Sequence, residues 1–231
     1  MSIHSKIVGS VGHLTIDRTE KANAYDRAHL DALDTAIQAL QTKCAVLLIR
    51  SAHPTVFCAG AALDEMQNAT SEDAARLYSQ AVFTRLARSS MVSIALVEGL
   101  AIGGGFELAL ASDIRVVGEH ARFRLPETGL GIIPAAGGGT RLTTLLGPSV
   151  AKQVILAGQD ISAQQAIHWG LAIDGQPNAF DTAHDLSESL ASRSPEALSQ
   201  AKEIIDEHAE RLSLQKERNV QSRLYALRNQ K

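Results

Sequence analysis

Two glutamates in glycine-containing segments are the side chains of this chain that could do acid–base chemistry. Glu107 follows three consecutive glycines, 103–105, and Glu127 follows Pro126 ahead of a second glycine run, 137–139. A carboxyl group can act as a general acid or base where the fold shifts its pKa. Taken alone, a glutamate beside a proline is typical of a solvated loop or a cap.

The small-residue segments could supply backbone donors. The glycines at 103–105 lie between a predicted strand and a predicted helix, where free N–H groups at the helix N-terminus suit an anion or a developing oxyanion. Their spacing is neither a dinucleotide fingerprint nor a phosphate loop. Close helix–sheet packing explains the same glycines equally well. For the segment 56–63, taken alone, a tight strand-to-helix turn is the favoured interpretation.

Other catalytic arrangements find little support in the sequence. It contains no G-x-S-x-G and no His-Glu-x-x-His, and its eight histidines are scattered, which predicts no metal site. Cys58 has no neighbouring base and is interpreted as a small buried hydrophobe. Cys44 and Cys58 form no disulfide framework.

The composition is that of a globular protein of one large domain. The chain has 231 residues, 45% of them hydrophobic, and a net charge of −3, which disfavours nucleic acids and anionic membranes as partners. Residues 1–6 lack an apolar signal core, and no apolar run approaches the ~18 residues of a membrane span. A cytoplasmic location is the resulting prediction.

Strand and helix patterns alternate along the first 190 residues. The segments 45–49, 92–97 and 114–117 are continuous apolar runs, typical of strands that are covered on both faces in a parallel sheet. Residues 7–16 predict a hairpin, and residues 30–40 an amphipathic helix. This alternation predicts an α/β fold with right-handed crossovers.

Helix-start signals organise the rest of the chain. Thr70 with Asp73, and Ser162 with Gln165, predict capping boxes, the first starting a helix that runs to about Arg88. Ser194-Pro195 predicts a further helix start. Glycines punctuate three short helical segments, at Gly147-Pro148, Gly158 and Gly170. The last helical face is predicted to carry Leu198, Ala201, Ile205, Ala209 and Leu212.

In this order, the segments resemble the enoyl-CoA hydratase/isomerase (crotonase) superfamily. The resemblance begins at residues 14–24 (LTIDRTEKANA) and continues through 57–66 (FCAGAALDEM) and 98–116 (EGLAIGGGFELALASDIRV). It then extends through 126–142 (PETGLGIIPAAGGGTRL) and 156–172 (LAGQDISAQQAIHWGLA), so it covers essentially the whole chain.

The resemblance implies one crotonase-like domain over residues 1–231. Residues 1–190 would form a spiral of ββα units, and residues 191–231 a helical region that packs across a homotrimer or a dimer of trimers. The implied substrates are coenzyme A thioesters, with no metal or redox cofactor. The chain ends about where the family's final helix would begin, so that region is expected to be shortened.

The family's site residues carry over to matching positions. Its two catalytic glutamates fall on Glu107 and Glu127, and the backbone amides of its oxyanion hole fall on Ala61 and Gly104. The implied substrate-binding residues are Ala22, Ala24, Ala59, Gly60, Ala62, Leu63 and Gly103. Three positions depart from the family: Thr19 replaces the usual proline of the entry motif, Ala62 stands where many members have Asp, and Asp64 stands where several have Lys.

The predicted activity is therefore the hydration of an enoyl thioester. Glu107 would act chiefly on the water and Glu127 chiefly on the proton at the α-carbon. One alternative is an isomerase of the same superfamily, in which a single glutamate moves the proton. The other is a catalytically silent interaction protein, against which the retained glutamates and glycines argue.

Overall fold

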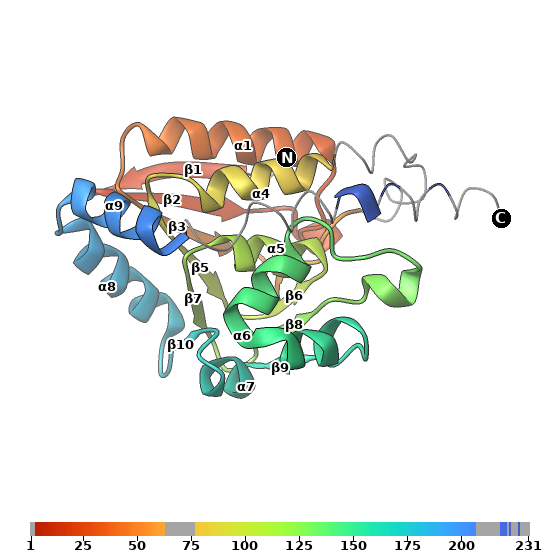
Figure 1. The fold of residues 1–231 in the computed structure, drawn as a ribbon. Helices are drawn as coiled ribbons and strands as arrows, with labels where there is room; N and C mark the ends of the chain where they lie inside the picture. Colours follow the sequence, from red (N-terminus) through yellow and green to blue (C-terminus); the bar gives the residue numbers. More distant parts are fainter. Residues whose placement is uncertain (1–2, 63–76, 207–217, 221, 223–225, 227–231) are drawn as a thin grey trace.

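The larger of two sheets organises the chain. The computed structural model describes residues 3–62, 77–206, 218–220, 222 and 226 (Figure 1). The six-stranded sheet has the order β1-β2-β3-β5-β7-β10, in which only the β1–β2 pair is antiparallel. Its strands are β1 (Ile3–Val8), β2 (Val11–Ile16), β3 (Val46–Ser51), β5 (Val92–Val97), β7 (Ile114–Val117) and β10 (Ile173–Asp174).

Three of the four strands of a smaller sheet directly follow strands of the first. Its order is β4-β6-β8-β9, with β4 parallel to β6 and β6 parallel to β8. The strands are β4 (Val56–Cys58), β6 (Leu100–Ile102), β8 (Arg122–Arg124) and β9 (Ile161–Ser162). The pairs β3–β4, β5–β6 and β7–β8 each place one strand in either sheet. The predicted α/β fold of spiralling ββ units is thus confirmed.

Helices cover both faces of the larger sheet. In Figure 1, α1 and α4 run side by side over one face, while α8 packs along strands of the other. The helices are α1 (Arg27–Gln41), α4 (Tyr78–Ala87), α5 (Gly104–Ala111), α6 (Gly138–Ile155), α7 (Ala163–His168), α8 (Ala179–Ala191) and α9 (Pro195–Asp206). Two short 3-10 helices span Thr19–Lys21 and Glu127–Leu130.

Alternating side chains of β3 show why the central strands are apolar throughout. Leu47 and Ile49 enter the core between the sheets and α1, α4 and α5, whereas Val46 and Leu48 enter the core beneath α8. All four are completely buried. Each face of the sheet therefore removes apolar area from water, at roughly 25 cal/mol per Å².

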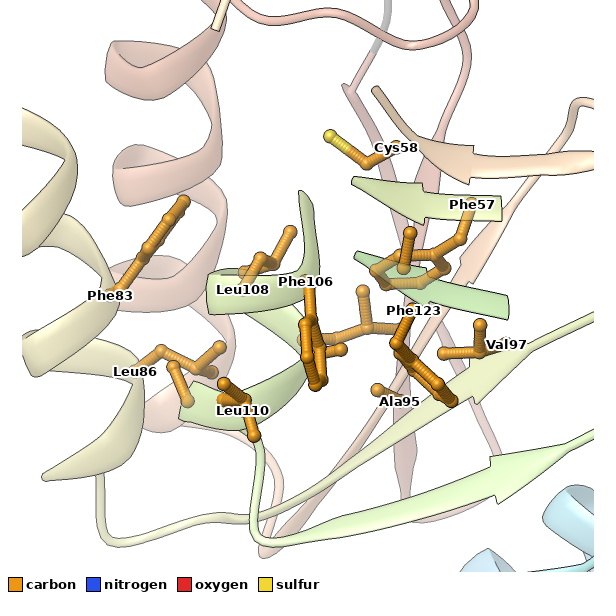
Figure 2. Packing of buried hydrophobic residues seen from close by; sticks show 14 of the residues in the cluster. Phe57, Cys58, Phe83, Leu86, Ala95, Val97, Phe106, Leu108, Leu110 and Phe123 are labelled. Atoms are coloured by element: carbon orange, nitrogen blue, oxygen red, sulfur yellow. The ribbon is translucent and has the colours of Figure 1, made fainter. Parts of the chain in front are cut away.

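Aromatic side chains fill the core beside α5. Phe106 on α5 packs against Phe123 on β8 with ring centroids 4.8 Å apart, and Phe83 on α4 lies at the other side of the helix (Figure 2). All three rings are fully buried. This packing holds the N-terminal turn of α5 in place.

The local signals read from the sequence agree with most element boundaries. The hairpin forms, although β1 already begins at Ile3. The Ser162–Gln165 capping box is present, and the Ser194 hydroxyl accepts a 3.3 Å hydrogen bond from the Ala197 N–H at the start of α9. The predicted start at Thr70 lies outside the described residues. Gly147, with φ of 75° and ψ of 166°, leaves the helical conformation and separates two helical segments of α6, as predicted.

The described residues of the predicted α9 face, Leu198, Ala201 and Ile205, line one cavity. Ile205 is 76% exposed, whereas Lys202 is buried and donates hydrogen bonds of 2.9 Å to the Met91 carbonyl and the Asp113 carboxylate. Its long apolar stem covers hydrophobic surface while its amine pairs with these acceptors, an arrangement that apolar periodicity does not detect. Ala209 and Leu212 lie outside the described residues.

No helix in the described part of the chain is long and apolar enough to cross a membrane.

His13 on β2, beneath α8, is a buried titratable residue, and we expect it to make the stability of the folded protein depend on pH. Its ring lies 6.4 Å from that of His184, and among the described residues its Nε2 has no hydrogen-bond partner. Burial, then the charges of Lys6, His184 and Arg50, lower the pKa of His13 below 6.5, against a raising effect of Glu188. The unfolded state therefore binds more protons as the pH falls through about 6.5, and stability is lost below that value.

We expect the melting temperature to fall between about pH 7 and pH 5.5, and to fall less in His13→Gln, which cannot titrate. Circular dichroism melts of both proteins across this range measure the difference. Equal pH dependence in the two proteins would assign the loss to other groups.

Candidate active site

The turn into α5 places Glu107 in a buried position facing α6. Gly103 has φ of 53° and ψ of −125°, a conformation that favours glycine and lets the chain leave β6 directly into the helix. Glu107, in the first turn of α5, is 4% exposed, and its Oε1 accepts a 2.8 Å hydrogen bond from the Gly138 N–H. Since Gly138 begins α6, the positive end of that helix favours a negative charge on Glu107.

Glu127 is buried as well. It begins the short 3-10 helix after Pro126 and is 7% exposed. The Glu127 Oε1 lies close to Gly103, since a Cβ atom added to that glycine would be 2.9 Å from it. The other carboxyl oxygen, Oε2, is buried and has no hydrogen-bond partner within the described residues. Burial raises the pKa of Glu127 to about 7. Around neutral pH, Glu127 can therefore hold a proton.

The amides of Ala61 and Gly104 are free in the part of the chain that the structure describes. Hydrogen bonds of 2.8 Å flank Ala61, from the Tyr25 N–H to the Gly60 carbonyl and from the Ala62 N–H to the Tyr25 carbonyl, but the Ala61 N–H itself has no acceptor. Gly104 is the first residue of α5, and its N–H likewise has no acceptor among the described residues. A Cβ atom added to Gly60 would lie 3.0 Å from the Gly104 nitrogen, so the two loops meet.

The three glycines before Glu107 serve both purposes that the sequence left open. A Cβ atom on Gly105 would overlap the Cys58 carbonyl, so this glycine permits α5 to pack against β4. A Cβ atom on Gly104 would overlap the Tyr25 hydroxyl, although the amide of Gly104 remains free. Gly105 thus permits the close packing of α5, and the neighbouring Gly104 supplies the free N–H donor.

Both glutamates and both amide-bearing residues line one cavity of about 700 Å³. Of the predicted substrate-binding residues, Ala24, Ala59, Gly60, Ala62 and Gly103 line it as well. Ala22 does not line it, because its carbonyl accepts the Ala59 N–H at 3.1 Å and thereby ties the two loops together. Leu63 and Asp64 lie outside the described residues.

Several cavity residues were not predicted from the sequence. Leu130, Ile132 and Ile133 give the cavity an apolar wall beyond Glu127. Tyr25 follows Ala24 directly, and this adjacency to a predicted binding residue was the only signal for it. Ser79, at the start of α4, had no signal at all.

Two basic residues also line the cavity. Arg18 donates 3.0 Å hydrogen bonds from Nη1 to the Ala24 carbonyl and to the Asp26 carboxylate. Lys21 is exposed and lies on the same stretch of chain. These cations make this side of the cavity suitable for an anionic group.

Comparison with known proteins assigns the chain to a family. The sequence profile described as enoyl-CoA hydratase/isomerase matches residues 6–231. The chain belongs to this family. It is an enzyme of the crotonase superfamily, and its similarity to relatives extends over most of its length.

Two relatives are named as hydratases. The chain is 36% identical over 230 residues to the probable enoyl-CoA hydratase 2, mitochondrial, of Arabidopsis thaliana, covering 93% of this chain and 76% of the relative. It is 38% identical over 202 residues to the 2,3-dehydroadipyl-CoA hydratase of Escherichia coli, covering 85% and 78%.

A solved structure of this family has the same fold. The enoyl-CoA hydratase from Bacillus anthracis superposes with a TM-score of 0.84 at 30% identity, covering 99% of this chain and 92% of that one. The crotonase fold expected from the resemblance is thereby confirmed.

Proposed function

We propose that this enzyme is an enoyl-CoA hydratase, which adds water to the C2–C3 double bond of a 2-enoyl thioester and catalyses the reverse dehydration. The observation that carries the proposal is one cavity lined by two buried glutamates and by two residues with free backbone amides. The hydratase names of the relatives support it.

The free amides would act on the thioester oxygen. When hydroxide adds to C3, negative charge moves onto this oxygen in an enolate-like transition state. Donors from Ala61 and Gly104 would stabilise that charge, and the Gly104 N–H lies at the positive end of α5. Loss of one such donor typically costs about 10²–10³ in rate.

The two glutamates would divide the proton transfers. Glu107, held at the start of α6, would accept a proton from water as its oxygen bonds to C3. Glu127, whose burial favours the protonated form, would donate its proton to C2. The product gains one OH and one H, and proton exchange with solvent restores both carboxyls. Addition of water transfers no electrons to the protein, which supports our proposal that no redox cofactor takes part. We propose likewise that no metal takes part, because the two amides would stabilise the charge on the thioester oxygen without one.

A screen of substrates tests the proposal. Trans-2-enoyl-CoA thioesters of varied chain length and branching are incubated with the enzyme while the absorbance of the conjugated thioester is followed. We expect this absorbance to fall with at least one of them. If no 2-enoyl thioester reacts but a 3-enoyl thioester gains the conjugated absorbance, the enzyme is an isomerase.

The pH dependence of hydration should follow Glu127. Because the pKa of Glu127 is about 7, its protonated fraction decreases as the pH rises through this value. We expect kcat/KM for hydration to fall about tenfold per pH unit on the alkaline side, while dehydration, which needs the ionised form, gains activity there. A hydration profile that stays flat from about pH 6 to about pH 9 would contradict the assignment of Glu127 as the acid.

We propose further that the enzyme is a homotrimer or a dimer of trimers. Apolar side chains support this proposal, since Leu145 on α6 and Leu198 and Ile205 on α9 line a second cavity, of about 390 Å³, and Leu145 is 43% exposed. Sedimentation velocity should give a trimer or a multiple of it. A fully active monomer at micromolar concentration would contradict it.

The cytoplasmic location stays a prediction, since the Arabidopsis relative is named mitochondrial.

A further inference from the structure

Tyr25 is tied to both loops that carry the free amides. Its backbone brackets Ala61, because its N–H donates to the Gly60 carbonyl and its carbonyl accepts from the Ala62 N–H, each at 2.8 Å. Its hydroxyl lies against Gly104, where even a methyl group would overlap it. The residue therefore links the two halves of the proposed oxyanion site and also lines the cavity.

The phenol ring is held in one orientation. It packs edge-on against Phe83 of α4, with ring centroids 5.9 Å apart and an interplanar angle of 89°. A phenylalanine would make this ring contact equally well, so packing does not explain the hydroxyl. A buried hydroxyl lowers stability unless it finds a hydrogen-bond partner.

The hydroxyl is neutral and remains a donor. Burial, followed by the charge of Glu107 and, more weakly, that of Glu127, raises the pKa of Tyr25 well above 10. The side chain of Ser79, which also lines the cavity, acts in the opposite direction on this pKa. The neutral phenol can donate its proton in a hydrogen bond to an acceptor inside the cavity.

We propose that the Tyr25 hydroxyl contacts the substrate, donating a hydrogen bond to the oxygen at C3. This oxygen belongs to the attacking water in hydration and to the hydroxyl of the 3-hydroxyacyl thioester in dehydration. The inference rests on the proposed function and adds a residue that selects thioesters with a polar group at C3. Water would then be held by two groups, with Glu107 accepting its proton and Tyr25 donating to its oxygen.

The test compares Tyr25→Phe, which keeps the ring packing and removes only the hydroxyl, with the wild-type enzyme. Calorimetry measures the binding of a 3-hydroxyacyl-CoA and of the saturated acyl-CoA of equal length, which has no oxygen at C3. We expect the variant to bind the 3-hydroxyacyl-CoA about tenfold more weakly, as for loss of one hydrogen bond, and the saturated ligand equally well. Its kcat/KM for hydration should fall by a similar factor.

Tyr78→Phe is the matched control. Tyr78 begins α4 next to Ser79, but its ring lies under Arg27 and it does not line the cavity. This variant should match the wild type in both binding and turnover.

Two results would overturn the inference. Equal weakening of both ligands in Tyr25→Phe would place the contact at the thioester, and unchanged binding and turnover would leave Tyr25 a packing residue. If the wild type hydrates no enoyl thioester, the proposed function fails. The comparison of the two ligands would still test the contact of Tyr25.

Discussion

Glu107→Gln is expected to lower kcat for hydration by about 10²–10⁴-fold, the usual effect of losing a general base. The glutamine keeps a side-chain oxygen that can accept the 2.8 Å hydrogen bond from the Gly138 N–H, so the local fold should be retained. It cannot take a proton from water at neutral pH. Steady-state turnover of a 2-enoyl-CoA substrate measures the loss.

Glu98→Gln is the matched control for this experiment. Glu98 is an exposed carboxylate at the end of β5 and does not line the cavity, so its loss should leave kcat unchanged. Glu127→Gln should be impaired as severely as Glu107→Gln. If Glu107→Gln turns over normally while Glu127→Gln is inactive, a one-base isomerase mechanism would replace the hydratase mechanism.

Ala61→Pro should lower kcat by about 10²–10³-fold, since proline has no N–H to donate to the thioester oxygen. The Ala61 N–H has no acceptor among the described residues, so its removal breaks no hydrogen bond of the fold. Binding of a saturated acyl-CoA should change much less than kcat, because the donor is needed most when negative charge develops. Steady-state kinetics and calorimetry together separate the two effects.

Ala61→Gly controls for the size of the side chain, because it removes the methyl group and keeps the N–H. It should retain most of the activity. Circular dichroism of the proline variant shows whether the turn after Gly60 is preserved. A folded Ala61→Pro enzyme with normal kcat would exclude this amide as an oxyanion donor.

Local patterns in the sequence determined much of the framework. Side chains of β3 alternate between two buried faces, so a continuous apolar run predicted a central strand. The capping box at Ser162 and Gln165 depends on residues three positions apart and forms as expected. Glu107 and Glu127, with the small residues around Ala61 and Gly104, were assigned by resemblance, and the fold brings all four to one cavity.

Contacts between distant segments decided what the sequence left open. Glu107 is held by an N–H that lies 31 residues further along the chain. The pKa of Glu127 is raised by burial, which follows from how the surrounding segments pack and from no local pattern. Ala22 ties two loops together and is not among the residues that line the cavity, whereas Tyr25 lines it. Periodicity and capping report on neighbours within one helix or strand, whereas the site forms where several elements meet, and only the tertiary structure brings them together.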